Sequence, residues 1–488
     1  MNKGTVGWRS GLTIVSDPSG DENYRIEHDS VGDKKVPLDA YYGVQSLRAA
    51  ENFPITGLNT HPEIVNSIVY IKKAAAITNK EIGKLPAEKA DAIVEACDEI
   101  LQGGFLDHFI VDPIQGGAGT SLNMNANEVI ANRAIEILGG SKGDYSIVHP
   151  NDHVNMGQST NDVVPTAGKM TTIRLLTNLR VQMQCLQIAL SKKAEEFKKV
   201  VKMGRTQMQD AVPISLGQEF QAYSDSVQRN VARLDAAIEE MSTVNMGGTA
   251  IGTGINADEE YISKIVPTLN RVSKMELRHA DDLIDSTQNL DPFVTVSGIV
   301  KASAVSLSKI ANDFRLMSSG PRTGFGEITL PAKQNGSSIM PGKVNPVIPE
   351  VVNQVAFNVI GNDMTITLAA EAGQLELNAF EPIIFYNLFQ SIDTLGFAVE
   401  TFTDNCVTGI EANEKRCREL VENSIGIITV LVPVVGYQKA ADTAKKALRE
   451  GRSVLDVVID DKLLDPDTAR DVLDPEKMLR NSSRERNQ

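Results

Sequence analysis

The sequence predicts a mainly α-helical protein with a central bundle of long helices. The chain has 488 residues, and because a typical domain has ~150 residues, it has the length of about three domains and can bury large cores. Beyond about Asn161, apolar residues recur at spacings of three and four through five long runs, which is the pattern of amphipathic helices. At ~1.5 Å per residue, helices of about 30 residues would be roughly 45 Å long, which suits a bundle.

Along the chain the pattern changes three times. Residues 1–23 mix Gly, Ser, Asp and Pro without a sustained period, which is typical of a flexible extension. From about Pro62 to Gly139, helix-like segments alternate with Gly and Pro, and after about Cys417 a Pro-interrupted segment leads into short charged helices. We therefore expect an N-terminal, mostly helical domain over residues 1–160, a central long-helix domain over 161–415 and a small C-terminal helical domain over 416–488.

The five long runs define the expected bundle helices. They extend from about Ile173 to Phe197, from Leu216 to Met241, from Val296 to Met317, from just after Pro346, and from about Pro382 to past Phe402. Small residues within them would let helices approach closely, namely Ala302, Ser303, Ala304, Ala369 and Ala370. Helices of partner subunits could therefore join the bundle, and we expect an obligate oligomer.

Composition and charge exclude several classes of partner. The chain has 63 acidic and 48 basic residues, a net charge of -15, which disfavours nucleic acid as a partner. An anionic substrate would need local cations or aimed N–H groups to overcome this field. The apolar stretch 424–438 contains Pro433 and is shorter than the ~20 residues of a membrane span. Charged residues interrupt the N-terminal segment, so it lacks the continuous apolar core of a signal peptide. We therefore expect a cytoplasmic protein that does not bind membranes.

Cysteine and histidine spacing indicates no zinc site. The four cysteines are far apart, form no CxxC and are interpreted as buried free thiols. His149 and His153 bracket the segment HPNDHVN, which could form a second anion site or be ordinary turn capping. The sequence also lacks GxGxxG after a strand, GxxxxGK[ST] and HExxH. The usual motifs of nucleotide-binding proteins and metalloproteases are therefore absent from it.

Polar clusters at breaks between helices could bind a carboxylate. The segment GSSIMPGKVNP, residues 336–346, leaves its backbone N–H groups outside any helical ladder, and Lys343 adds a positive charge. The alternative is a mobile connection between helices. Residues 158–162, QSTND, could bind anions at a helix N-terminus or simply cap it. Residues 116–128, GGAGTSLNMNANE, carry amides that would meet a ligand or a buried network, and 204–211, GRTQMQDA, would end the first long helix.

Taken together and in this order, QSTND, GRTQMQDA and GSSIMPGKVNP resemble the fumarase and aspartase superfamily of lyases. The resemblance extends from about Tyr24 to the end of the chain. YYGVQSLRAAENFPITG, the GRTQ motif and EAGQLELN, residues 371–378, are most similar to the aspartase branch. Fumarases usually carry His where this chain has Gln207. Two departures are Val432, where many relatives have Asn, and the segment before Tyr24, which matches no family feature.

The resemblance implies a three-domain, mostly helical subunit and a homotetramer with a multi-helix bundle, whose active sites are each built by three subunits. It implies reversible anti elimination of ammonia from L-aspartate to give fumarate, through an aci-carboxylate intermediate. It implies no required cofactor, with divalent-metal activation left open. The alternatives are a fumarate hydratase of the class II type, against which Gln207 argues, and a non-catalytic dicarboxylate-binding relative, against which the retained Ser337 and Lys343 argue.

Site residues follow from the resemblance, position by position. Ser337 is the expected general base, acting as an oxyanion. A free serine hydroxyl is too weak a base near neutrality, so loop N–H groups and a nearby cation must stabilise its alkoxide. The α-carboxylate is assigned to Lys343, Asn345 and Thr206; the β-carboxylate and its enediolate form to Thr120, Ser159, Thr160 and Ser338; the amino group to Asn161 and Gln207; and a further carboxylate contact to Arg48.

Overall fold

A computed structural model describes residues 23–479, so the predicted extension over residues 1–23 lies, except for its last residue, outside the described residues. The described chain divides into two compact units. Unit 1 comprises residues 23–178, 234–301 and 359–393, and unit 2 comprises residues 179–233, 302–358 and 394–479. The predicted domain limits after residues 160 and 415 stay a prediction.

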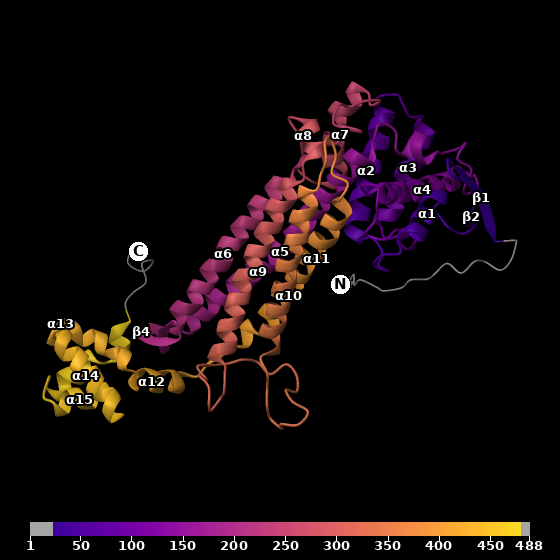
Figure 1. Cartoon of the computed structure of the whole chain (residues 1–488). Helices are drawn as coiled ribbons and strands as arrows, with labels where there is room; N and C mark the ends of the chain where they lie inside the picture. Colours follow the sequence, from indigo (N-terminus) through magenta and orange to yellow (C-terminus); the bar gives the residue numbers. More distant parts are fainter. Residues whose placement is uncertain (1–22, 480–488) are drawn as a thin grey trace. The chain divides into compact units, whose positions relative to one another are not determined.

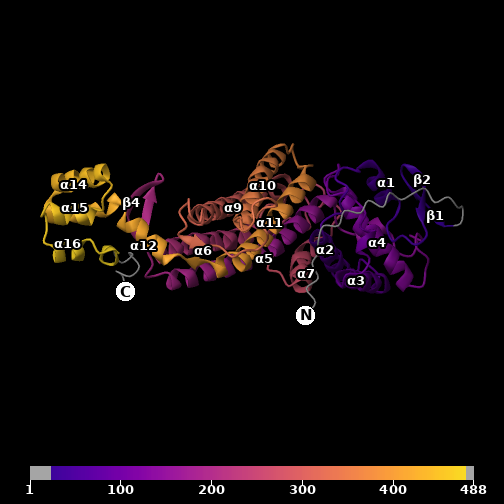
Figure 2. The same cartoon turned by 90° about the horizontal axis from the view of Figure 1, so that it is seen from below.

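The five predicted bundle helices are confirmed. They are α5 (Thr160–Glu196), α6 (Leu216–Met241), α9 (Asp291–Met317), α10 (Val347–Glu371) and α11 (Glu381–Asn405) (Figures 1 and 2). Each of them contributes residues to both units. In unit 1, the Phe293 ring of α9 lies 5.3 Å from the Phe385 ring of α11. In unit 2, the Phe314 ring lies 5.3 Å from that of Phe220 and 5.5 Å from that of Phe402. Buried aromatic side chains therefore join the helices in each unit.

Unit 1 also holds the N-terminal helices. Helix α2 packs against α3, α4 and α7, and β1 and β2 form an antiparallel hairpin. The other elements of this unit are β1 (Tyr24–Asp29), β2 (Gly32–Pro37), α1 (Val44–Asn52), α2 (Pro62–Glu81), α3 (Ala87–Leu101), η1 (Leu106–His108), α4 (Thr120–Ile137), η2 (Pro150–Val154), β5 (Thr243–Val244), α7 (Glu259–Ser273), β6 (Arg278–His279) and α8 (Leu283–Gln288).

Unit 2 contains a hairpin where the sequence suggested the end of a helix. Helix α5 ends at Glu196, and residues 204–211 lie instead in the antiparallel pair β3 (Val201–Thr206) and β4 (Gln209–Ser215). The prediction for this segment was wrong, because its strands are short and carry a glycine and a proline. A second small pair, β7 (Ile328–Thr329) with β8 (Glu411–Ala412), lies in the same unit.

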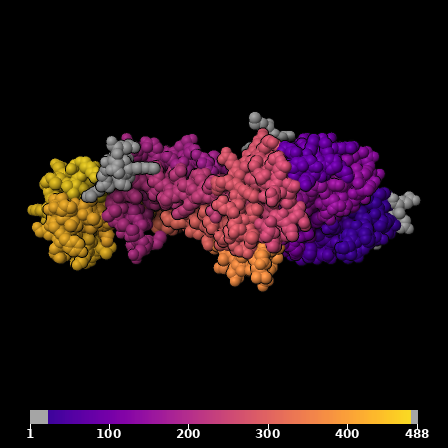
Figure 3. Space-filling view, turned by 90° about the horizontal axis from the view of Figure 1, so that it is seen from above, coloured from indigo at the N-terminus to yellow at the C-terminus, as the bar shows by residue number. Residues whose placement is uncertain are grey.

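Short C-terminal helices share one core with this hairpin. Val201 and Met203 of β3 pack with Val421, Leu431 and Val457, and the last helices form a compact cluster, yellow in Figure 3. The elements here are η3 (Val407–Gly409), α12 (Glu414–Glu422), η4 (Ile425–Leu431), α13 (Val432–Val435), α14 (Tyr437–Glu450), α15 (Val454–Asp460), α16 (Pro466–Val472) and η5 (Pro475–Met478). The predicted short terminal helices are confirmed.

Helix α9 is long and apolar enough to cross a membrane by length and composition, which the sequence reading had overlooked. Its buried face carries Phe293, Val296, Leu307 and Phe314, and Ser297 donates a 2.8 Å hydrogen bond to Asp363 of α10. A buried core helix of a bundle passes the same length and composition test, and this packing explains its apolar character.

Candidate active site

In unit 1, a glycine brings Thr120 next to the start of α5. Gly119 has a φ of +81°, and a Cβ on it would lie 2.7 Å from Cγ1 of Val164. Only glycine combines this backbone conformation with so close an approach. Thr120 follows directly as the first residue of α4, and its side chain is exposed. Helix α4 therefore begins beside the N-terminal part of α5, which carries Thr160, and the Thr120 hydroxyl donates a 2.7 Å hydrogen bond to the Gly117 carbonyl.

The QSTND segment is held by a buried carboxylate that the sequence reading had not assigned. Asp162 accepts hydrogen bonds from the backbone N–H groups of Ser159 (2.9 Å), Gly247 (3.0 Å) and Thr249 (3.1 Å). Burial raises the pKa of Asp162 to about 6, and the three N–H donors oppose this shift. Its position inside a polar cluster gave no sign of burial, because Asp in a first helical turn is usually a solvated cap.

The hydroxyls of this segment are partly engaged within the chain. The Ser159 Oγ accepts the N–H of Asn161 at 3.2 Å, which is the capping that the sequence offered as an alternative. Asn161 donates its side-chain amide to the Ala250 carbonyl at 2.7 Å. Thr160 accepts a 3.2 Å hydrogen bond from Asn123 of α4. The amides in residues 116–128 thus enter a buried network, one of the two outcomes expected for them.

Arg48 is not a free cation. Its guanidinium donates to Asp29 through Nε (3.0 Å) and Nη2 (3.2 Å), and to the Gly32 carbonyl at 2.8 Å. Arg48 lines a cavity of about 540 Å³ in unit 1 together with His149 and Asn151. His149 accepts the N–H of Asn151 at 3.1 Å through Nδ1, so turn capping is present there. The ion pair with Asp29 offsets the charge that Arg48 would offer to a substrate.

In unit 2, the loop at residues 336–346 supplies N–H donors to Ser337. Its Oγ accepts the backbone N–H groups of Met340 (3.0 Å) and Ile339 (3.2 Å). Two such donors stabilise negative charge on the oxygen and so favour the alkoxide. Of the two stabilising features expected for a serine base, the structure of this loop provides the N–H donors. Ser338 and Lys343, the other predicted loop residues, are exposed.

A glycine also closes this loop at its base. A Cβ on Gly336 would lie 1.8 Å from the Lys343 carbonyl oxygen, a distance that no side chain could occupy. The Asn345 side chain donates a 2.7 Å hydrogen bond to the Gly336 carbonyl. The two ends of the loop therefore touch, and this contact holds Lys343 and Asn345 beside the residue that precedes Ser337.

Thr206 and Gln207 lie at the tip of the β3–β4 hairpin. Thr206 pairs with Gln209, so Gln207 and Met208 form a two-residue turn, with φ values of 53° and 64°. Two consecutive non-glycine residues in the left-handed region are strained, and such strain often occurs at functional sites. The Thr206 and Gln207 side chains are exposed, so both are available to a ligand.

Glu327 was missed by the sequence reading and connects the hairpin with the segment leading to the loop. It is fully buried, and Arg205, the residue before Thr206, donates to its Oε1 at 2.9 Å. Lys202 of β3 lies 3.4 Å from its Oε2. Its only sequence signal is an isolated charge within FGEITL. The predicted unit 2 residues thus lie on two segments joined by a buried ion pair.

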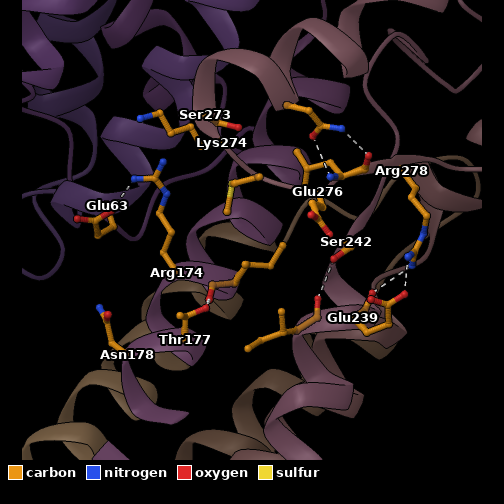
Figure 4. Close-up of a pocket in the computed structure, with 15 residues that line it drawn as sticks. Glu63, Arg174, Thr177, Asn178, Glu239, Ser242, Ser273, Lys274, Glu276 and Arg278 are labelled. Carbon is orange, nitrogen blue, oxygen red and sulfur yellow. Dashed lines mark hydrogen bonds and ion pairs between the residues drawn. The ribbon is translucent and has the colours of Figure 1, made fainter. Parts of the chain in front are cut away.

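A cavity of about 940 Å³ in unit 1 lies elsewhere and contains none of the predicted site residues. Figure 4 shows the side chains that line it. Two cations in its wall have carboxylate partners, since Arg174 lies 3.6 Å from Glu63 and Arg278 pairs with Glu239. Within residues 23–479, no group of His, Cys, Asp and Glu side chains is arranged to hold a metal ion.

Comparison with known proteins identifies the family. The sequence profile of a lyase family matches residues 32–361, and that of the fumarase C C-terminus matches residues 427–480. The chain belongs to the fumarase/aspartase superfamily of lyases. An aspartate ammonia-lyase from Bacillus subtilis (strain 168) is 53% identical over 462 residues, which cover 95% of this chain and 97% of that protein. The superfamily resemblance drawn from the motifs is therefore confirmed.

Solved structures of the superfamily share the fold. The fumarate lyase:delta crystallin from Brucella melitensis bound to cobalt has a TM-score of 0.91 and 52% identity, and the match covers 93% of this chain and 99% of that one. A class II fumarase from Schistosoma mansoni has a TM-score of 0.90 and 35% identity over 93% of this chain and 99% of that one. The predicted mainly α-helical architecture is the fold of these lyases.

Proposed function

We propose that this superfamily member is an aspartate ammonia-lyase, which reversibly converts L-aspartate to fumarate and ammonia. The observation that carries the proposal is the Ser337 Oγ, which accepts two backbone N–H groups in a chain 53% identical to an aspartate ammonia-lyase. The enzyme is then a carbon–nitrogen lyase.

The reaction begins at the carbon next to the β-carboxylate. The Ser337 alkoxide removes a proton from this carbon and becomes a hydroxyl. The electron pair moves into the β-carboxylate, which becomes the aci-carboxylate, and then forms the double bond while the C–N bond breaks and ammonia leaves from the ammonium group. The hydrogen-bond donors must point at the β-carboxylate oxygens, because their second negative charge develops only as the proton is removed.

Different predicted residues bind the α-carboxylate, the amino group and the β-carboxylate of the substrate. Lys343, Asn345 and Thr206 hold the α-carboxylate, and Asn161 with Gln207 holds the amino group. The β-carboxylate is bound by Thr120, Ser159, Thr160 and Ser338, with Arg48 a weaker contributor because Asp29 already engages it. The exposure of Thr120, Thr206 and Gln207 supports sites that other subunits complete.

A homotetramer with shared active sites is part of the proposal. Helix α10 exposes one apolar stripe, with exposed fractions of 40% to 64%, made by Phe357, Ile360, Met364 and Leu368. Such a stripe on a bundle helix favours packing against further helices, here those of other copies of the chain. Light scattering should give four times the 52.9 kDa chain mass. Phe357→Asp should lower that mass, whereas Leu448→Asp, at an exposed apolar residue of α14, should leave it unchanged.

The deciding experiment mixes the purified protein with L-aspartate, and separately with L-malate, and follows the ultraviolet absorbance of the conjugated double bond of fumarate. We expect the absorbance to rise with aspartate alone. A rise with malate alone would make the protein a hydratase and contradict our interpretation of Gln207. No change with either substrate, from a folded oligomer, would favour another amine as substrate or the non-catalytic relative.

Cofactor use and location complete the proposal. We propose that no cofactor is required, since the residues above supply base, donors and charge, and that the enzyme acts in the cytoplasm. Turnover should persist after dialysis against EDTA. Readdition of Mg²⁺ then tests divalent-metal activation separately.

A further inference from the structure

A fully buried lysine lies beneath the QSTND segment. Lys72, on α2, has no exposed surface. Its Nζ donates three hydrogen bonds, to Asn123 Oδ1 of α4 (2.7 Å), Asn155 Oδ1 (2.8 Å) and Gln158 Oε1 (3.0 Å). All three acceptors are neutral amide oxygens. The Nζ can donate to all three acceptors at once only in the ammonium form, because a neutral amine has two N–H donors.

The positive charge of Lys72 has no contacting carboxylate to offset it. Within residues 23–479, the hydrogen bonds given above for its Nζ all go to amide oxygens and none to a carboxylate. The nearby titratable groups are Asp162 from α5 and Cys97 from α3, while Tyr261 from α7 faces Asp162. Asp162 is itself held by three backbone N–H groups. Burial lowers the pKa of Lys72 to about 7, and Asp162 and Cys97 oppose that shift.

The lysine connects directly to predicted substrate-binding groups. Asn123, held by Lys72 through its oxygen, donates its amide to the Thr160 Oγ1 at 3.2 Å and to Asn155 at 3.2 Å. Gln158, the third acceptor, directly precedes Ser159. Lys72 therefore fixes both sides of the segment: through Asn123 it orients the Thr160 hydroxyl, and through Gln158 it fixes the chain before Ser159.

The need for a positive charge near an anionic substrate also favours Lys72. The chain carries a net charge of -15, so an anionic substrate needs a local cation. Arg48, the cation that the resemblance suggested, pairs with Asp29. Lys72 is buried among neutral amides, where a charge is screened less than at the surface.

We propose that Lys72 is a positioning residue for the β-carboxylate subsite, which orients Thr160 through Asn123 and supplies the positive charge behind that subsite. The role rests on the proposed function for the identity of the substrate. Binding of a dicarboxylate would then favour the ammonium form of Lys72, so binding should draw in a proton from solution at a pH where the free amine is partly neutral.

The test uses Lys72→Met in the full-length protein, with Lys169→Met as the matched control. Lys169 is also a buried lysine of unit 1, on α5, but its Nζ donates to the Thr243 carbonyl. Succinate is the probe, because it has both carboxylates and no amine. Isothermal titration in two buffers of different ionisation enthalpy at pH 8 gives its Kd and the protons taken up, and aspartate turnover gives KM and kcat.

We expect Lys72→Met to raise the succinate Kd and the aspartate KM roughly tenfold or more, to change kcat less, and to abolish proton uptake. Lys169→Met should keep the wild-type Kd and proton uptake. A merely structural role for Lys72 would not remove the proton uptake, so wild-type Kd and uptake in folded Lys72→Met would overturn the proposal. Wild-type protein that binds succinate but does not deaminate aspartate would refute the proposed function instead.

A second variant covers the case in which Lys72→Met does not fold. Asn123→Asp places a carboxylate against the Lys72 Nζ, so the pair should fold while the positive charge is cancelled and the amine stays protonated. We expect weaker succinate binding without proton uptake. Wild-type affinity in Asn123→Asp would contradict the proposed role of the charge.

Discussion

Replacing Gly336 by alanine tests whether the closed base of the loop is needed for catalysis. The added Cβ would lie 1.8 Å from the Lys343 carbonyl oxygen. Because van der Waals contact begins at about 3.4 Å, the two ends of the loop must separate by about 1.6 Å. The hydrogen bond from Asn345 to the Gly336 carbonyl, now 2.7 Å, would break.

A shift of this size should reduce the rate strongly. A misplacement of about 1 Å between reacting groups costs about a hundredfold, so kcat/KM for L-aspartate should fall at least about 100-fold. The melting temperature should change little, because residues 338–344 of the loop are exposed. The assay is the initial rate of fumarate absorbance over a range of aspartate concentrations, with thermal unfolding measured on the same sample.

Gly342→Ala is the matched control in the same loop. Gly342 has a φ of +82°, and no atom lies within 4 Å of its Cβ position. The substitution therefore adds backbone strain of about 1 kcal/mol without a collision, and its kcat/KM should fall much less. If Gly336→Ala retains wild-type kcat/KM, the close approach of the loop ends has no role in placing Lys343 and Asn345.

Three further predictions concern single groups. Ser337→Ala should abolish turnover and retain succinate binding, whereas Lys343→Ala should weaken both; normal turnover in the serine variant would refute its role as base. Met208→Gly should relieve about 1 kcal/mol of left-handed strain in the hairpin turn and slightly raise the melting temperature with activity retained; a lower melting temperature would show that the turn is not strained. Lys72, whose pKa burial lowers to about 7, binds fewer protons in the folded than in the unfolded state between pH 7 and its ordinary pKa near 10.4, so stability should rise with pH above 7 in the wild type relative to Lys72→Met. Identical pH dependence in chemical denaturation of the two proteins would contradict this shift.

The long helices could be predicted from sequence because their signal is local and repeated. Periodic apolar residues in the second run placed its ends at Leu216 and Met241, where α6 begins and ends. The β3–β4 hairpin could not be found in the same way, because six or seven residues give little periodicity. Its strands are stabilised instead by contacts with distant residues such as Val421 and Leu431.

In the candidate site too, contacts between sequence neighbours could be predicted, whereas contacts between distant residues could not. The N–H donors to Ser337 come from residues two and three positions away, so local chemistry could anticipate them. The partner of Arg48 is Asp29, which lies 19 residues away. Lys72 and Lys73 are neighbours in IKKAAA, yet Lys73 pairs with Asp98 and Lys72 is buried. Sequence periodicity does not distinguish the two, because the difference depends on which helices pack against α2.

The shared core makes the stability of the β3–β4 hairpin depend on the C-terminal helices, which are distant in sequence. Val201 and Met203 lie in the same cluster as Val457, and Ser424 donates a 2.7 Å hydrogen bond to Asp210 of β4. Residues that never meet substrate thus belong to the same cooperative folding unit as Thr206 and Gln207. A substitution that destabilises the terminal helices should therefore also unfold the hairpin locally and lower the enzyme's activity. The terminal helices should tolerate fewer substitutions than their distance in sequence from Thr206 and Gln207 suggests.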